Sequence, residues 1–206
     1  MALSLVGVGA KVTAAITNGI INLTNLQGLT SVIPTAVAGT GVSVGARGKV
    51  TFTNTATNID LQGVFTNLYD DYLIVVHART SSTTVSFQLL DATNTALTTA
   101  TYDVQLMGAS STSAIIAQGL GATSWNVGAT TATIQDIKVD LFSPFLAAET
   151  TGLGLALGTP NPMTTAAAIS QRGLMNRNAL SYAGLRVFLA AAGPIGSVRV
   201  YGYNPN

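Results

Sequence analysis

Cysteine is absent from the chain, and histidine and tryptophan occur once each, as His77 and Trp125. The lack of cysteine excludes a disulfide scaffold, a thiolate metal site and a cysteine nucleophile. A catalytic triad or a histidine-rich metal site needs partners placed around the imidazole, whereas His77 stands alone in a stretch with strand-like alternation. We therefore interpret His77 as a strand-face histidine with a local hydrogen bond.

Charged residues are also scarce, at 8% of the 206 residues, where ordinary soluble domains carry roughly 25%. Hydrophobic residues make up 48%, and the mean hydropathy is +0.45. The net charge is +1 and the basic residues are scattered, so no basic field for nucleic acid is expected. A chain this apolar either enters a membrane or covers much of its surface with other protein.

The pattern of the apolar residues argues against a membrane span. A spanning helix needs about 20 consecutive apolar residues, but Gly, Thr, Ser or Asn interrupts every long apolar stretch. A membrane barrel has aromatic girdles at both interfaces, and aromatics are only 6% here. A secretory signal is not expected either, because Lys11 follows the first apolar run instead of preceding it. Low charge therefore indicates large contacts with partner proteins, since obligate interfaces are depleted of charge at their cores.

Residues 1–41 are predicted to form an N-terminal anchoring arm and linker. Leu23, Leu26 and Leu29 recur at a spacing of three, which fits either a short helical turn or an arm that packs on a neighbour. Asn18-Gly19 and Gly28 argue against one long helix. The arm's apolar residues cannot form a core alone, and we expect them to anchor it on a neighbouring subunit or another protein: Leu3, Leu5, Val6, Ile16, Ile20, Leu23 and Leu26.

From residue 42 to 206 the apolar residues alternate with a period of two, which predicts β-strands. The residues on either side of GARG at 45–48 predict a hairpin, YLIVVHAR at 72–79 predicts a central strand, and Val85, Phe87 and Leu89 share one strand face. Asp136, Lys138 and Asp140 are expected on the outward face of another strand. Short strands between Thr-, Ser-, Asn- and Gly-rich turns indicate an all-β fold, an antiparallel β-sandwich of jelly-roll type.

Residues 150–177 are the exception to this alternation. They are rich in Gly, Ala and Thr and carry no charge between Glu149 and Arg172. We predict a long loop between strands, which is uncommon unless the loop is functional or packs on a partner. Its composition suits packing on a protein lattice better than gripping a sugar.

The remaining candidates for chemistry are weak. Paired carboxylates serve glycosidases, but Asp136 and Asp140, with Lys138 between them, are more typical of a solvated or interface strand face. Asp70-Asp71, with Asn67 nearby, falls short of the six or more oxygens that calcium takes, and we favour a turn in which Asp caps backbone amides. The glycine patterns GVGA and GLGLALG lack the setting of a nucleotide loop. No enzyme activity, cofactor or metal is expected.

Three segments in order carry a family resemblance that covers most of residues 49–206. The first is the loop built from Gly63, Val64, Phe65, Thr66, Tyr69, Asp70 and Tyr72, after one strand and before the central one. The second is VDLFSPFLAAETTG, with Ser143 where Asn is common, and the third is the ending GSVRVYGYNPN. Together they resemble the small jelly-roll structural proteins on the surface of tailed-phage virions.

The loop residues also have a physical interpretation, as residues that lock the fold. Phe65 can plug the end of the sandwich, while Tyr69 and Tyr72 can bury their rings and fix the loop through their hydroxyls. Asp70 can cap the turn. These are folding roles, and the resemblance brings no catalytic residues.

The resemblance implies a non-enzymatic structural protein at the virion surface. Members of this group are usually trimers, and occur as head decorations or as tail-tip and fibre proteins. Many tail members carry a collagen-like Gly-X-Y stem, which this chain does not have. We expect a homotrimeric decoration or cement protein on the capsid, bound to the major capsid protein and to itself; the alternative is a tail-tip or tail-fibre module for host attachment, bound to a tail protein.

Overall fold

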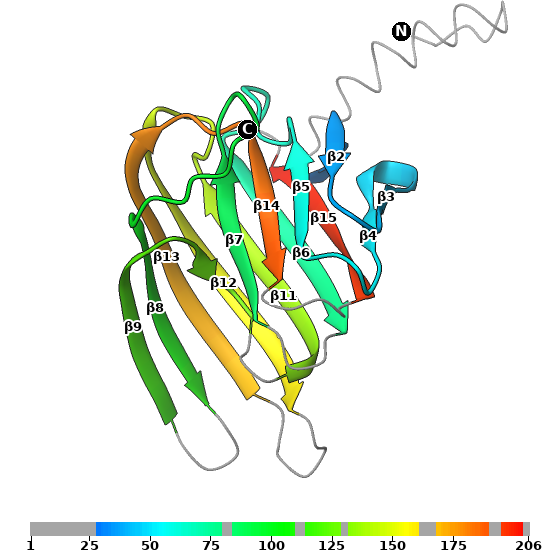
Figure 1. Cartoon of the computed structure of the whole chain (residues 1–206). Coiled ribbons are helices and arrows are strands. Elements are labelled where there is room, and N and C mark those ends of the chain that lie inside the picture. The colour runs from blue at the N-terminus through cyan, green and yellow to red at the C-terminus, as the bar shows by residue number, and fades with distance from the viewer. Residues whose placement is uncertain are drawn as a thin grey trace, which may run out of the picture.

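The computed structural model describes residues 28–79, 84–109, 114–128, 132–160, 168–189 and 195–203. These residues form two packed antiparallel sheets (Figure 1), which confirms the predicted all-β sandwich. In the described part of the chain the one helical element is a short 3-10 turn, η1 (Ala46–Gly48).

The larger sheet has ten strands and the smaller has five. The order across the larger sheet is β3 (Val42–Val44), β4 (Val50–Phe52), β15 (Ile195–Tyr203), β6 (Asp71–Arg79), β11 (Ala132–Phe142), β12 (Ala148–Pro160), β13 (Ala168–Leu180), β8 (Tyr102–Ala109) and β9 (Ala114–Ala122), and β1 (Leu29–Val32) also pairs with β15. The order across the smaller sheet is β10 (Trp125–Asn126), β7 (Val85–Leu90), β14 (Gly184–Leu189), β5 (Asn58–Gln62) and β2 (Ala36–Ala38).

Eight of these strands make a jelly roll. In chain order they are β4, β5, β6, β7, β10, β11, β14 and β15, and each step except β7 to β10 passes from one sheet to the other. The resulting sheet orders, β4-β15-β6-β11 and β10-β7-β14-β5, place the first strand beside the last in one sheet. This is the double Greek-key arrangement of two facing four-stranded sheets.

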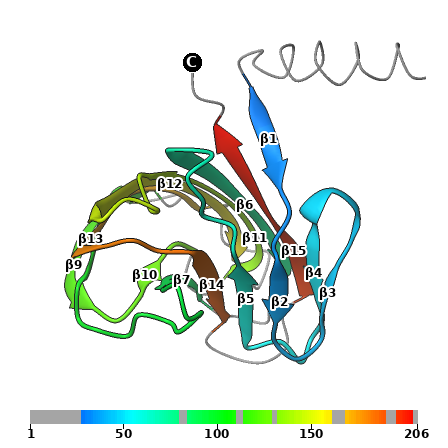
Figure 2. The ribbon, with the colours of Figure 1, turned by 90° about the horizontal axis from the view of Figure 1, so that it is seen from above.

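Two hairpins are inserted into the jelly roll, and both lengthen the larger sheet. The hairpin β8–β9 lies between β7 and β10 in the chain, and β12–β13 lies between β11 and β14. In the sheet they lie side by side beyond β11, in the order β12-β13-β8-β9. We call these four strands the sheet extension. Figure 2 shows that the extension curls around, so that β9 approaches β10 of the smaller sheet.

The core lies between the sheets and is built by alternation along the strands. On β6 the side chains of Ile74 and Val76 are fully buried. Val139 lies opposite Ile74 on the neighbouring strand β11. Phe87, on β7 of the smaller sheet, belongs to the same core cluster. Trp125 on β10 packs edge-on against Tyr102 of β8, with ring centroids 5.1 Å apart. Its indole nitrogen donates a hydrogen bond to the Met175 carbonyl on β13 at 2.9 Å. The core therefore includes the inner side of the extension.

Several strands match the sequence predictions. β3 and β4 pair as the predicted hairpin, with Val42 opposite Phe52. β6 is a central strand between β15 and β11. Val85, Phe87 and Leu89 are all fully buried, although Ser86 and Gln88 between them are nearly so as well. Alternation with a period of two located β3, β4 and β7, and the nearly continuous apolar run located β6 as a central strand.

The segment before Val42, predicted to be arm and linker, supplies two strands of the sandwich. β1 pairs with the end of β15, and β2 pairs with β5. Val32 and Val37 are partly buried against the core. Gly39 and Gly41, both with positive φ, follow β2 and turn the chain into β3. The last part of the predicted arm and linker is therefore a strand and a tight turn, because its apolar residues have core to pack against.

The prediction of a long loop over residues 150–177 is wrong. Most of this segment belongs to β12 and β13, which pair antiparallel with each other, while β12 also pairs with β11 and β13 with β8. Glycine and alanine at alternating positions weaken the usual strand signal. The pairing with two flanking strands stabilises the segment as sheet despite its composition.

Candidate functional site

The sheet extension exposes large apolar side chains to solvent along β12. Leu153, Leu155 and Leu157 are 60%, 46% and 43% exposed. The residues between them face the interior and are all small: Gly152, Gly154, Ala156 and Gly158. A strand with leucine on the solvent side and glycine on the core side reverses the usual order of burial.

Close approach of β11 explains one of the small residues on the inner side of β12. A Cβ added to Gly152 would lie 2.8 Å from the Asp140 carbonyl oxygen, which is too close for a side chain unless the backbone moves. A Cβ added to Gly154 would lie 3.5 Å from Cβ of Arg172, an ordinary van der Waals contact.

The apolar surface continues across the neighbouring strands. Leu155 lies opposite Gln171 on β13, which lies opposite Met107 on β8, and Leu157 lies opposite Ile169 on β13. Met107 is 58% exposed and Ile169 is 55% exposed. Five side chains from three adjacent strands thus form what we call the outer apolar face: Met107, Leu153, Leu155, Leu157 and Ile169.

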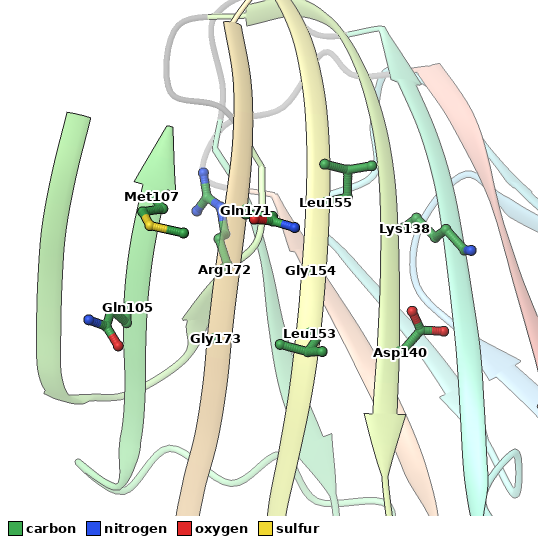
Figure 3. Close-up of a pocket in the computed structure, with 10 residues that line it drawn as sticks. All are labelled: Gln105, Met107, Lys138, Asp140, Leu153, Gly154, Leu155, Gln171, Arg172 and Gly173. Carbon is green, nitrogen blue, oxygen red and sulfur yellow. The ribbon is translucent and has the colours of Figure 1, made fainter. Parts of the chain in front are cut away.

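A groove runs through this face (Figure 3). Its volume is about 450 Å³, and Leu153 and Leu155 line it from β12, while Gln105 and Met107 line it from β8. Gly173 on β13 lies between Leu153 and Gln105 in the strand register. A Cβ added to Gly173 would have no atom within 4 Å, so the absence of a side chain there leaves the groove open.

Charged residues border the outer apolar face on the β11 side. Asp136, Lys138 and Asp140 point outward, as predicted, and lie opposite Leu157, Leu155 and Leu153. His77 on β6 makes the local hydrogen bond expected of it, with Nδ1 2.6 Å from Oδ1 of Asp136. The hydroxyl of Tyr203 donates to Asp140, and this bond contributes to a raised pKa of Tyr203, about 12, whose main cause is desolvation. The border is therefore polar and structured.

Behind the outer apolar face, Arg172 carries a charge into the interior. The residue is 5% exposed, and its guanidinium donates to the carbonyl oxygens of Asn126 and Gly128 and to the hydroxyl of Ser170. Desolvation lowers the pKa of Arg172 to about 10. These bonds connect β13 to the end of β10, so Arg172 holds the extension against the smaller sheet.

The predicted fold-locking loop comes together around Tyr72. The Tyr72 hydroxyl donates to the Thr66 carbonyl at 2.9 Å and accepts from the Thr66 amide at 2.7 Å. The Phe65 ring packs edge-on against Tyr72 with centroids 4.9 Å apart, and Tyr69 does the same at 5.9 Å. Phe65 and Tyr72 are buried. The aromatic residues thus fix one end of the sandwich.

The two neighbouring aspartates make different contacts from the cap predicted for Asp70. The backbone carbonyl of Asp70 accepts a hydrogen bond from the Ser143 amide at 3.0 Å. The side chain that meets the same amide is that of Asp71, with Oδ1 at 3.2 Å. Within the described ranges, no group of three or more His, Asp or Glu side chains is placed to hold a metal ion.

The sequence analysis did not predict the outer apolar face, although the face has a signal in the sequence. The run LGLALG at 153–158 alternates with a period of two, but glycine at nearly every second position suggested a loop.

The predicted anchoring residues Leu3, Leu5, Val6, Ile16, Ile20, Leu23 and Leu26 lie outside the described residues. None of the helical segments within the described ranges is long and apolar enough to cross a membrane. No family model matches the chain, and no curated protein or solved structure matches it.

Proposed function

We propose that the chain is a non-enzymatic structural protein of a tailed-phage virion, a homotrimeric decoration or cement protein attached to the capsid surface. The observation that carries the proposal is the outer apolar face. The resemblance of residues 63–72, 139–152 and 196–206 to phage surface proteins supplies the setting. The alternative within the same setting is a tail-tip or tail-fibre module.

The energetics of the outer apolar face support a permanent partner. Fully burying one large aliphatic side chain stabilises by roughly 1.5–3 kcal/mol, and the five side chains of this face are each about half exposed. Covering them contributes on the order of 1 kcal/mol each. A contiguous apolar surface rimmed by polar residues is typical of a protein interaction site.

The shape of the outer apolar face supports a protein partner over a small ligand. The face spreads over three adjacent strands, and Asp136, Lys138 and Asp140 form its border. A polar rim around an apolar centre is the usual anatomy of a protein interface. In a closed trimer, each copy can cover apolar surface of the next, so none is left exposed.

The copy number per particle tests the capsid location. Quantitative gel analysis of purified virions is expected to show hundreds of copies of the chain. A few to a few tens of copies would contradict the decoration role and favour the tail module. Absence of the chain from purified virions would contradict both.

A variant tests whether the outer apolar face is what attaches the chain. Replacing Leu153, Leu155 and Leu157 together by Gln is expected to leave the circular dichroism spectrum unchanged and to reduce incorporation into particles by at least about tenfold, because about 1.4 kcal/mol corresponds to tenfold in binding. Leu68→Gln is the control for replacing an exposed leucine, since Leu68 is 66% exposed and lies in the turn before β6, outside the five residues of the face. Equal incorporation of the two variants would rule out the face as the attachment surface.

A further inference from the structure

We infer that the groove of the outer apolar face binds the distal part of the N-terminal segment, residues 3–12, of a neighbouring copy of this chain. The inference deepens the proposed function, because it names the partner of the same face. It is drawn from the form of the groove, the chemistry of the segment and the length of chain that precedes β1.

The groove has a shape that can accept apolar side chains. Gly173 forms its floor. A second hollow of about 390 Å³ begins on the other side of Gly173 and is lined by Gln105, Gln118, Leu120 and Met175. Both hollows share Gln105 and Gly173. An extended peptide laid across β13 would therefore find one hollow on each side of Gly173 for its side chains, which alternate in direction along a strand.

The side chains of residues 3–12 match the apolar lining of this groove. The segment contains Leu3, Leu5, Val6, Val8 and Val12. Lys11 is the one charged residue among residues 1–27. The groove is lined on β11 by Lys138 and Asp140, and Asp136 lies next to them on the same strand face. This border holds two carboxylates and one ammonium group, so Lys11 has a carboxylate to pair with there. An apolar segment with a single cation thus meets an apolar groove whose border carries one more negative than positive charge.

The length of the segment favours a neighbouring copy. β1 is four strands from β12, through β15, β6 and β11, which is about 19 Å at roughly 4.8 Å per strand. An extended chain covers that distance in about six residues. The six residues before Gly28 are the run NLTNLQ, in which four polar side chains surround Leu23 and Leu26, so the shortest connection to a chain's own groove brings few apolar side chains to it.

Residues 3–12 lie much farther along the chain. They are separated from Leu29 by 17 to 26 residues, or roughly 55–85 Å of extended chain. A folded domain of this size has a radius of gyration near 16 Å and a width of about 40 Å. The segment is therefore long enough for its apolar end to reach a neighbouring copy, and a ring of copies gives each groove one segment to bind.

A photo-cross-linking experiment on the full-length chain tests the inference. The chain has no cysteine, so Gln105→Cys introduces one thiol at the groove, which is labelled with benzophenone maleimide. The labelled protein is mixed with unlabelled ¹⁵N-enriched chain, irradiated and analysed by mass spectrometry. We expect cross-links to ¹⁵N peptides from residues 1–27, which only a second copy can supply.

Each other outcome contradicts the inference. Cross-links to residues 1–27 of the same molecule alone would place the segment on its own groove. Cross-links to the folded part of a second copy would mean that two sheet faces pack together. No cross-link to either would mean that another molecule, or none, occupies the groove.

A pair of glycine variants in the same background supplies the control. Gly173→Leu fills the groove, whereas Gly119→Leu adds the same side chain on β9, opposite Val104 and on the other face of the sheet. A Cβ at either position meets no atom within 4 Å, so both variants should keep the fold, as circular dichroism will check. We expect Gly173→Leu to lower the cross-link yield about tenfold and Gly119→Leu to leave it within about twofold.

Equal yields in the two glycine variants would overturn the assignment of the groove. This experiment uses purified chain without particles. A negative result would therefore not affect the copy-number measurement, which tests the proposed function independently.

Discussion

Arg186 on β14 and Asp60 on β5 lie opposite each other and are joined by two hydrogen bonds, from Nε to Oδ1 at 2.6 Å and from Nη2 to Oδ2 at 2.8 Å. The Asp60 side chain is 11% exposed. The hydrogen bond to this carboxylate raises the pKa of Arg186. A two-point ion pair on the smaller sheet thus fixes the register of β5 and β14.

Asp60→Asn is expected to lower the free energy of unfolding by about 1.5–3 kcal/mol, because it removes charge-assisted bonds from a largely buried pair. Urea denaturation measures the change. The control is Asp136→Asn, which breaks the His77–Asp136 pair, whose side chains are 63% and 50% exposed; here the loss should stay below about 1 kcal/mol. Equal losses would show that burial does not distinguish the two pairs.

Two glycine-to-alanine variants should change stability in opposite directions. At Gly196 on β15, an added Cβ would overlap the His77 carbonyl oxygen, and backbone cannot yield easily, so Gly196→Ala should destabilise by about 1–3 kcal/mol. At Gly173 the same change meets open space and should stabilise by up to about 1 kcal/mol, since glycine is unfavourable within a strand. Thermal and urea unfolding of both variants test this; a loss of stability in Gly173→Ala would show that the surface there is not open.

Tyr72→Phe should destabilise the sandwich by about 1–3 kcal/mol, because it leaves the amide and carbonyl of Thr66 without their hydroxyl partner. Tyr69→Phe is the control: among the described residues no hydrogen bond of its hydroxyl is found, and its ring contact with Tyr72 is kept. Its effect should be within about 0.5 kcal/mol. Similar effects of the two substitutions would mean that the ring, and not the hydroxyl, fixes the loop.

Stability is expected to fall as the pH rises above about 10. Burial raises the pKa of Tyr182 to about 12 and raises that of Tyr102 further, from an ordinary value of 10.0. In the unfolded chain these phenols ionise near pH 10, while in the fold they stay neutral, so their stabilising contribution is complete below pH 10 and is lost as the pH climbs through 12.

Unfolding free energies measured from pH 8 to 12, with tyrosinate absorbance as a second signal, check this alkaline loss. Tyr182→Phe should show a shallower decline than the wild-type chain. Arg172 acts in the opposite direction, since its pKa is lowered in the fold, and deprotonation there relieves an unfavourable buried charge. The buried tyrosines outnumber this single arginine. A rise in stability above pH 10 would therefore contradict the predicted effect of the tyrosines.

The sequence was most informative where large apolar and polar residues alternate. The pattern around Val139 and Lys138 predicted both the strand and its orientation, and Ile74 marked the central strand. It failed where the core side of a strand is lined by glycine. Leu153, Leu155 and Leu157 alternate as clearly as any strand, yet which side of β12 faces the core depends on the packing of the whole sheet, and no local pattern reports it.

The outer apolar face was beyond sequence analysis for the same reason. Met107 and Leu155 are brought close by the pairing of β13 with both β8 and β12, and no local pattern reports that pairing. The physical interpretation of the aromatic residues predicted the loop around Phe65 and Tyr72 as a folding element. The contacts of that loop fit the role, although its Asp71 side chain, and not that of Asp70, meets the Ser143 amide.

The sheet extension joins two hairpins by one distant pairing, and this has a consequence for folding. β11, β12 and β13 form a meander of neighbours in sequence, as do β8 and β9, but Ile169 on β13 pairs with Ala109 on β8, sixty residues earlier. Local pairings close small loops and form first, so pulsed hydrogen exchange should show the amides of β8 that face β13 protected after those paired within each hairpin. Leu155 and Met107 then become one surface only after both hairpins have formed. A partly folded chain therefore does not present the continuous apolar surface while its hairpins are still forming.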